Sequence, residues 1–159
     1  MDRVRLYTDG ACSPNPGVGG WGVVLISDQR GARKELSGAE AHTTNNRMEL
    51  LAAIRGLEAL KRRCAVEIST DSQYVHNAFA NRWLDRWKSN GWRTAEKKPV
   101  QNEDLWRRLL ELEQVHEVRW RWVRGHAADA ENNRADALAV EARLRLAAEL
   151  DRRGAAPRG

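Results

Sequence analysis

The sequence predicts an α/β fold in which a five-stranded mixed sheet is flanked by helices. Three observations point to this class: three strand-like segments come first, strands and helices alternate after them, and one basic segment interrupts the alternation. A hairpin should pair the first strands antiparallel, whereas helical crossovers should make the later pairs parallel. The length of 159 residues suits a single domain with one core.

The first three strands are expected near the N-terminus. Residues 4–8 alternate apolar and polar side chains up to Asp9, as a half-buried strand does. Residues 14–20 contain two prolines and three glycines, which predicts a loop. Residues 21–26 and 33–37 lie on either side of a polar turn and therefore predict an antiparallel hairpin.

A helix, a strand and a second helix are expected next. Residues 43–46 supply N-cap candidates for a helix whose apolar stripe extends to about Arg62. Residues 65–70 have the pattern of a strand that ends at Asp71, and residues 72–80 have a helical pattern. Such alternation is typical of parallel strand pairs.

The segment from Arg82 to Lys98 carries most of the chain's excess charge. It holds six cations and two anions, a net charge of +4 against +5 for the whole chain. Three of the seven tryptophans, Trp83, Trp87 and Trp92, fall in it as well. Tryptophans usually pack into a core, but Trp83 and Trp87 lie four residues apart and are flanked by arginine and lysine, which is untypical of a core helix. The charge permits a nucleic-acid partner without establishing one.

The rest of the chain predicts a helix, a strand and a long last helix. These are expected at residues 102–115, 118–122 and 132–150. Residues 1–150 should therefore form the only domain. Residues 151–159 contain glycine, proline and charge without an apolar period, which predicts a disordered C-terminal tail.

Nothing in the sequence indicates a membrane or a secretory pathway. No stretch approaches the roughly 20 apolar residues that a membrane-spanning helix needs, and the first residues have no signal-peptide pattern. Cys12 and Cys64 have no partner at C-x-x-C spacing, so both are expected to be reduced thiols. We therefore expect a cytoplasmic protein without membrane contact, a monomer by default, with no obligate protein partner.

Four carboxylates stand where the predicted fold can bring them together. Asp9 and Asp71 follow predicted strands, and the carboxyl ends of neighbouring strands meet at one edge of a sheet. Glu49 and Asp136 lie in the first turns of predicted helices. Such groups would repel one another unless hard divalent cations bound them, and oxygen ligands favour Mg²⁺ or Mn²⁺. Two ions about 3.5–4 Å apart can activate water and stabilise the leaving oxygen of a phosphodiester.

Each of these residues also has a simpler explanation. The two strand-end aspartates could serve turns, and Glu49 could close a capping box with Asn46. Asp136 could face solvent and favour a helix N-terminus, and His126 could be a loop histidine without a role. Taken singly, these explanations are favoured, and only the joint pattern favours a metal site.

Six blocks of the sequence resemble the ribonuclease HI family and follow that family's order. The resemblance covers the chain from about Val4 to Leu150. It implies a ribonuclease H-like fold with a basic protrusion, and a metal-dependent endonuclease that cuts the RNA strand of an RNA–DNA hybrid, leaving a 3′-hydroxyl and a 5′-phosphate. The blocks are YTDGAC (7–12), NPG (15–17), TTNNRMEL (43–50), STDSQYV (69–75), WVRGHA (122–127) and ENNRAD (131–136).

The resemblance implies roles for the acidic residues and for one histidine. Asp9 would bridge two Mg²⁺ ions in the presence of substrate, with Mn²⁺ a possible substitute. Glu49 and Asp71 would complete one ion site and Asp136 the other. His126 falls on the histidine that assists proton movement or product departure in the family.

The resemblance also implies eleven substrate contacts, at Asn15, Thr44, Asn45, Asn46, Tyr74, Trp83, Trp87, Lys88, Lys97, Lys98 and Asn102. The three loop asparagines can test for a 2′-hydroxyl, although turn and cap formation also explain them. The aromatic side chains would pack against deoxyriboses of the DNA strand, and Thr44 and Asn102 would grip a DNA phosphate. The lysines of the protrusion should displace phosphate counterions.

Two departures from the family pattern are visible. His42 stands where many relatives carry arginine, which would weaken the phosphate grip or make it pH-dependent. Ala127, Ala128 and Ala130 replace the glycine and proline common in the loop after His126, which would change loop mobility and turnover.

Two alternatives remain open from the sequence. Integrases and junction resolvases share this architecture and cut other substrates. A module that binds hybrids without cutting them is the other alternative, and the four intact carboxylates argue against it. Cleavage rates on hybrid, duplex RNA and duplex DNA would separate these functions.

Overall fold

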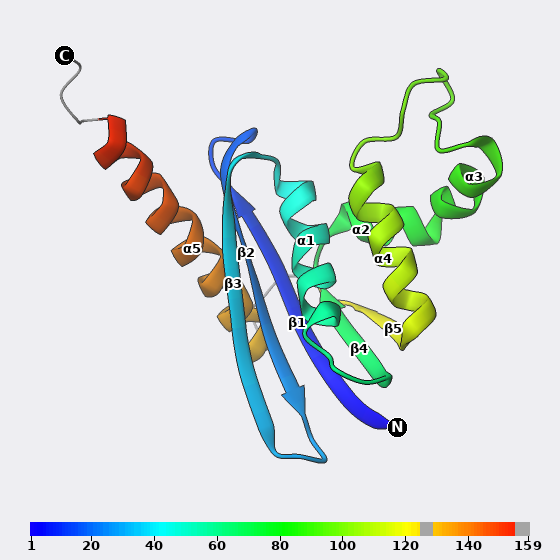
Figure 1. Ribbon diagram of the computed structural model, residues 1–159, viewed down its shortest axis with the longest axis horizontal. Coiled ribbons are helices and arrows are strands. Elements are labelled where there is room, and N and C mark those ends of the chain that lie inside the picture. Colours follow the sequence, from blue (N-terminus) through cyan, green and yellow to red (C-terminus); the bar gives the residue numbers. More distant parts are fainter. Residues whose placement is uncertain (125–128, 155–159) are drawn as a thin grey trace.

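Five strands form one mixed sheet in the order β3-β2-β1-β4-β5, with helices on both of its faces (Figure 1). The computed structural model describes residues 1–124 and 129–154. The predicted α/β class and mixed sheet are confirmed, and α3 is the helix of the predicted protrusion. The elements are β1 (Asp2–Cys12), β2 (Gly17–Ser27), β3 (Ala32–Thr43), α1 (Asn45–Glu58), β4 (Cys64–Thr70), α2 (Gln73–Ala80), α3 (Trp83–Asn90), α4 (Glu103–Val115), β5 (Glu117–Trp122) and α5 (Ala130–Gly154).

The connections explain the strand directions. β1 pairs antiparallel with β2, and β2 with β3, because short segments join them directly. β1 and β4 are parallel, as are β4 and β5, because helices cross over between them. In Figure 1, α1 and α4 lie on one side of the sheet and α5 on the other. β1 is therefore covered on both faces, and it carries the first of the four candidate carboxylates.

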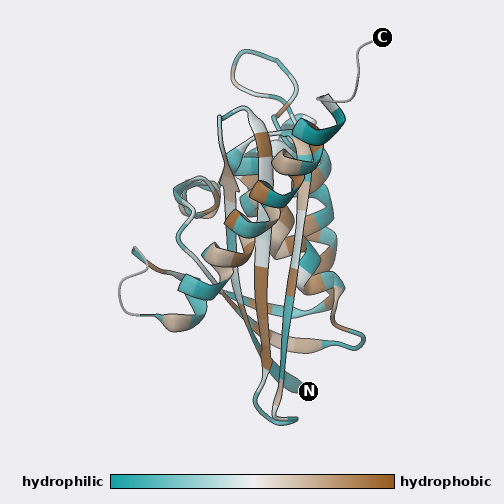
Figure 2. Ribbon diagram, turned by 90° about the vertical axis from the view of Figure 1, so that its left-hand side faces the viewer, coloured by the Kyte–Doolittle hydropathy of each residue, from teal (hydrophilic) through white to brown (hydrophobic). Residues whose placement is uncertain are grey.

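The larger core lies between the sheet and α1, α2 and α4. Trp106 is completely buried there, whereas Trp21, Trp120 and Trp122 are half-buried against its margin. Hydrophobic and hydrophilic stretches alternate along both the strands and the helices (Figure 2). A second, smaller cluster lies under α5 and buries four residues, Tyr7, Val24, Ala135 and Leu138.

The predicted loop at residues 14–20 is wrong in its second half, because β2 begins at Gly17. The glycines there serve packing rather than a turn. A Cβ on Gly20 would lie 2.2 Å from the carbonyl oxygen of Ala139, and one on Gly22 would lie 2.3 Å from that of Ala135. Only residues without a side chain allow the α5 backbone to lie this close to β2.

Two helix boundaries differ from the predicted ones. α1 ends at Glu58 rather than near Arg62, since the last turn tightens and Leu60 N donates to Leu57 O. α5 continues to Gly154, so the predicted tail is wrong for residues 151–154. Arg152 and Arg153 favour the last turn of a helix through its dipole. Residues 155–159 lie outside the described residues.

No helix in the described ranges combines the length and apolar character needed to cross a membrane.

Candidate active site

Three carboxylates from separate elements converge at one end of the sheet. Asp9 comes from β1, Glu49 from α1 and Asp71 from the residue that follows β4. One carboxylate oxygen of each lies within 4.8 Å of the corresponding oxygens of the other two. Asp9 and Glu49 are buried, while Asp71 is half-exposed. The predicted convergence of these three residues is confirmed.

The point at which β1 stops pairing with β4 explains the position of Asp9. The strand does not end at Asp9, as the sequence suggested, but continues to Cys12. Its parallel pairing with β4 ends at Tyr7 and Ser69, whereas its antiparallel pairing with β2 continues past Asp9 to Cys12. Asp9 therefore stands on a fixed strand beside the gap that β4 leaves open.

Glu49 reaches the cluster from the second turn of α1. The helix is capped by Thr44, whose hydroxyl accepts from Arg47 N at 3.2 Å, so the capping box expected between Asn46 and Glu49 does not form. A Cβ on Gly10 would lie 2.6 Å from Glu49 N. Gly10 thus lets the first turns of α1 approach β1 closely enough for the carboxylates to meet.

Asp136, on α5, lies beside Asp9 rather than within the group of three. Among the described residues, it is not one whose oxygens share the 4.8 Å separation with Asp9, Glu49 and Asp71. Its side chain is nevertheless at hydrogen-bonding distance from Asp9, and this contact helps to raise the pKa of Asp9. The four acidic residues predicted from the sequence therefore all meet at Asp9.

Burial and mutual repulsion make this cluster electrostatically unfavourable when ionised. Burial, followed by the charge of Asp71, raises the pKa of Asp9 to about 7. Burial and the charges of Asp9 and Asp71 raise the pKa of Glu49 well above its ordinary value. Within the described part of the chain, buried Glu49 Oε2 has no hydrogen-bond partner. An oxygen-only donor set with this repulsion fits a hard divalent cation.

The loop asparagines Asn15 and Asn45 and the phosphate-pocket residues lie around the start of α1. Asn15 Oδ1 accepts from Asn45 N at 3.1 Å, which ties the loop before β2 to the start of α1. Thr44 and Asn102 line one cavity of about 440 Å³ together with His42. The two predicted phosphate contacts are thus on one surface, and the histidine that departs from the family pattern faces the same space.

Arg47 also lines this cavity, although the sequence analysis did not single it out. Its guanidinium pairs with both carboxylate oxygens of Asp104 on α4, at 2.8 and 3.1 Å. The available signal was its place in the TTNNRMEL block, between two residues with assigned roles.

The predicted aromatic channel corresponds to a second groove, of about 460 Å³. Tyr74, Trp83 and Trp87 line it together with Lys98. The Trp83 and Trp87 rings lie 5.9 Å apart, and Tyr74 lies 6.3 Å from Trp83. These side chains form one continuous aromatic wall at the base of the protrusion.

The other lysines of the protrusion have different surroundings. Lys97 is exposed, whereas Lys88 borders a smaller cavity beside Glu113, away from the aromatic groove. Trp92 is buried, and the Arg107 guanidinium lies 4.7 Å from its ring centroid, which anchors the protrusion to α4.

His126 lies outside the described residues, as do Ala127 and Ala128. Asp129 and Ala130, the last residues of that segment, are described. Asp129 Oδ1 accepts from the backbone nitrogens of Glu131 and Asn132, so it caps α5.

Comparison with known proteins gives consistent matches over most of the chain. The sequence model of a family described as RNase H matches residues 1–143. The chain is 60% identical over 139 residues to a ribonuclease H of Rhodopseudomonas palustris (strain BisB5), covering 87% of this chain and 91% of that protein. It is 61% identical over 137 residues to one from Phenylobacterium zucineum (strain HLK1), covering 86% and 88%.

Solved structures agree with these sequence matches. LC9-RNase H1, a type 1 RNase H with a type 2 active-site motif, superimposes with a TM-score of 0.79 at 33% identity. That match covers 90% of this chain and 72% of the other. RNase H1 from the halophilic archaeon Halobacterium salinarum NRC-1 gives a TM-score of 0.62 at 32% identity, covering 88% and 96%.

Proposed function

The chain belongs to the RNase H family, and from this membership we propose that its carboxylate cluster hydrolyses the RNA strand of RNA–DNA hybrids. The convergence of Asp9, Glu49 and Asp71 within 4.8 Å carries the proposal. The reaction is endonucleolytic and leaves a 5′-phosphate and a 3′-hydroxyl on the RNA.

Two Mg²⁺ ions are the cofactors in this proposal, with Mn²⁺ as a substitute. Bound divalent cations supply an activated water and neutralise charge on the phosphodiester. Asp9, Glu49 and Asp71 would hold one ion, and Asp9 with Asp136 the other. The raised pKa values of Asp9 and Glu49 support this assignment, since a cation would relieve the repulsion that produces them.

The remaining residues of the chain would position the hybrid. Asn15, Asn45 and Asn46 would test for the 2′-hydroxyl on the RNA strand. Thr44 and Asn102 would hold a DNA phosphate in the cavity that they share. His126 would move a proton or help product to depart.

The aromatic groove and the protrusion would contact the DNA strand and its backbone. Tyr74, Trp83 and Trp87 would pack against deoxyriboses, with Lys98 on the same wall. Lys88 and Lys97 would add cations to the protrusion, where they displace counterions from phosphates.

The experiment that tests this function compares three substrates with and without divalent metal. The purified chain should cut the RNA strand of a hybrid in Mg²⁺, and should lose this activity when a chelator removes the metal. Duplex RNA and duplex DNA of the same sequence should remain uncut. Equal rates on duplex DNA would instead favour an integrase or resolvase activity, and hybrid binding without cleavage would favour a binding module.

We also propose a cytoplasmic monomer without an obligate protein partner. The free thiols of Cys12 and Cys64 support a reducing compartment. Light scattering of the purified chain at several concentrations would measure its mass, and a mass of about twice 18.0 kDa would contradict the monomer.

A further inference from the structure

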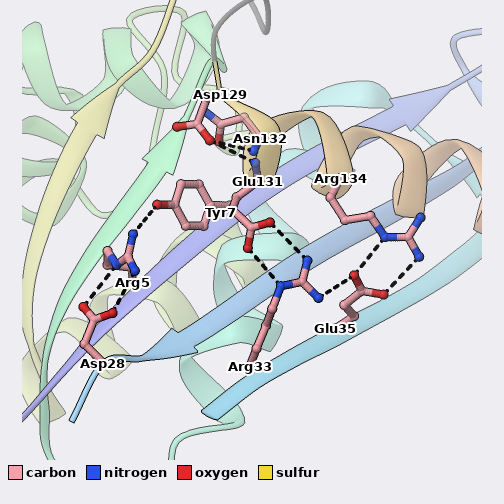
Figure 3. Close-up of polar contacts among 9 residues, drawn as sticks. All are labelled: Arg5, Tyr7, Asp28, Arg33, Glu35, Asp129, Glu131, Asn132 and Arg134. Atoms are coloured by element: carbon pink, nitrogen blue, oxygen red, sulfur yellow. Dashed lines mark hydrogen bonds and ion pairs between the residues drawn. The ribbon is translucent and has the colours of Figure 1, made fainter. Parts of the chain in front are cut away.

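Four charged side chains link β3 to the first two turns of α5 (Figure 3). The Arg33 guanidinium pairs with both oxygens of Glu131, at 3.0 and 3.1 Å. The Arg134 guanidinium pairs with both oxygens of Glu35, at 2.8 and 3.0 Å. Arg33 also donates to Glu35 at 2.9 Å, so the two forked pairs form one chain of contacts. We call Arg33, Glu35, Glu131 and Arg134 the β3–α5 network.

The network lies beside the part of α5 that carries Asp136. Arg134 precedes Asp136 by two residues, and Glu131 precedes it by five. Across the same end of the helix, Arg121 of β5 lies 3.5 Å from the capping residue Asp129. The first turns of α5 are therefore held by charged contacts on both sides, and the next turn contains the carboxylate that contacts Asp9.

Apolar packing alone gives this part of α5 little resistance to sliding. Among the described residues the helix buries five side chains, of which Leu138 is the one large apolar side chain; the others are Asn132, Ala135, Ala139 and Ala142. At Gly20 and Gly22 the helix backbone rests directly on β2, where the strand has no side chains to fill gaps between helix residues. Two forked ion pairs, by contrast, fix both the distance between β3 and α5 and the direction in which the helix faces the strand. They do so because each planar guanidinium donates to two oxygens of one carboxylate.

We infer that Arg33, Glu35 and Arg134 are positioning residues, which set where Asp136 lies relative to Asp9. None of them touches the carboxylate cluster in the described structure, so they act only through the placement of α5. The inference rests on the proposed function in one respect, namely that Asp136 takes part in binding the second ion.

The charge state of the network supports this role. Contacts with Arg134 and then Arg33 hold the pKa of Glu35 down at about 2, so this carboxylate stays ionised wherever the enzyme is folded and active. The side chains are only partly covered, with 29% of the Glu35 side chain and 38% of the Arg134 side chain exposed. Salt therefore screens the pairs, and variants must be compared at one ionic strength.

The test uses one disrupting variant, one restoring variant and one matched control. Glu35→Gln removes the charge that joins the two forks but keeps the size of the side chain. The double variant Glu35→Arg with Arg134→Glu places both cations on β3 and the anions on α5, so forked pairs can form again. Asp28→Asn is the control, since Asp28 also accepts a forked pair, from Arg5 at 2.8 and 3.2 Å, and makes no hydrogen bond or ion pair with the described residues of α5 (Figure 3).

Kinetics and metal dependence form the first measurement. Glu35→Gln should lower kcat on a hybrid severalfold and raise the Mg²⁺ concentration needed for half-maximal rate, while KM for the hybrid stays unchanged. The double variant should recover both values, and Asp28→Asn should not alter them. The inference is overturned if Glu35→Gln keeps the wild-type kcat and Mg²⁺ requirement, or if Asp28→Asn causes the same loss.

A second measurement does not depend on activity. Amide resonances of Asp136 and Asp9 in ¹⁵N-labelled protein without metal should shift in Glu35→Gln and return in the double variant. The Asp9 resonance reports a change in the position of α5 rather than a direct effect of the substitution, because β2 separates the strand of Asp9 from β3. Shifts in β3 and α5 that leave the Asp9 resonance unchanged would overturn the inference. A wild-type chain that fails to cut hybrids would defeat the proposed function, while this spectrum would still decide the positioning role.

Discussion

Asp9 is the residue through which the acidic cluster is connected. Its carboxylate is repelled by the charge of Asp71, shares a hydrogen bond with Glu49 and lies at hydrogen-bonding distance from Asp136. Its backbone belongs to the central strand, and Gly10 N donates to Asp9 Oδ1 at 2.9 Å. A carboxylate held this firmly cannot turn away from its neighbours, so the repulsion persists until a cation or a proton relieves it.

The first prediction concerns Asp9 itself. Asp9→Asn should lower hybrid cleavage in Mg²⁺ by roughly 10³-fold or more, since it removes the one charge that both ion sites share. Hybrid binding should survive, because the grooves of Trp83 and Thr44 do not include Asp9. Cleavage assays and fluorescence anisotropy measure the two effects separately. Substantial residual cleavage would show that Asp9 does not bridge the ions.

At the residue level, the sequence identified the acidic positions but not their surroundings. The family resemblance named Asp9, Glu49, Asp71 and Asp136 because their types and order suffice for a motif. Arg47 could not be identified from the sequence, because its ion pair is with a carboxylate 57 residues away, on α4. The same holds for Glu35 and Arg134, which are 99 residues apart in the chain. Long-range ion pairs leave no local pattern in a sequence.

At the scale of elements, Gly20 and Gly22 of β2 set how closely α5 approaches the sheet. Gly22→Ala would place a Cβ 2.3 Å from Ala135 O and should push α5 away from the sheet. We expect a loss of about 1–3 kcal/mol in the free energy of unfolding, as overpacking usually costs, together with a lower kcat.

Urea denaturation and cleavage assays measure both effects of Gly22→Ala. Gly154→Ala is the matched control, because a Cβ there meets nothing within 4 Å. Wild-type stability in Gly22→Ala would mean that α5 is not seated on this glycine.

The protrusion should control how hybrid affinity depends on salt. Each phosphate contact contributes about 0.9 to the slope of log affinity against log salt concentration. Replacing Lys88, Lys97 and Lys98 by alanine should therefore flatten the slope. All three lysines are exposed, so each can contribute to that change.

Binding titrations at several salt concentrations measure this slope. The single variant Lys61→Ala, an exposed lysine outside the protrusion, is the control and should leave the slope near that of the wild type. An unchanged slope in the triple variant would mean that the protrusion does not contact the backbone.

Element types were more predictable than element boundaries. Periodicity identified every strand of the sheet, and the N-caps of α1 and α2 fall at Thr44 and Ser72, within or at the edge of the expected ranges. Gly17, Gly19 and Gly20 suggested a loop, yet they lie in β2. Glycines are expected both in turns and in strands on which a helix packs closely, so the sequence alone does not separate the two structures. Only the tertiary contact with the helix distinguishes them.

For the whole molecule, the acidic cluster links stability to pH when divalent ions are removed. The pKa of Asp9 in the folded state, about 7, lies above its ordinary value of 3.8. The folded protein thus binds the proton more tightly, and this contribution to stability is lost as pH rises through 7. Between pH 5.5 and 8 we expect Asp9 to lower the free energy of unfolding by about 2 kcal/mol.

Urea titrations in the presence of a chelator measure this dependence. Burial lowers the pKa of His116, which makes a contribution of the opposite sign, so the wild type is compared with Asp9→Asn. The variant should lack the decline attributed to Asp9 and should be more stable at pH 8. Parallel curves for the two proteins would show that Asp9 carries no raised pKa.

The separation of the two hydrophobic clusters predicts the order in which activity and folded structure are lost on heating. Asp9, Glu49 and Asp71 belong to elements that pack on the larger core, whereas Asp136 is carried by a helix above the smaller one. Local openings start where the fewest apolar contacts are lost. Detachment of α5 would therefore separate Asp136 from the other three carboxylates while the rest of the sheet stays intact, and we expect thermal inactivation to precede global melting.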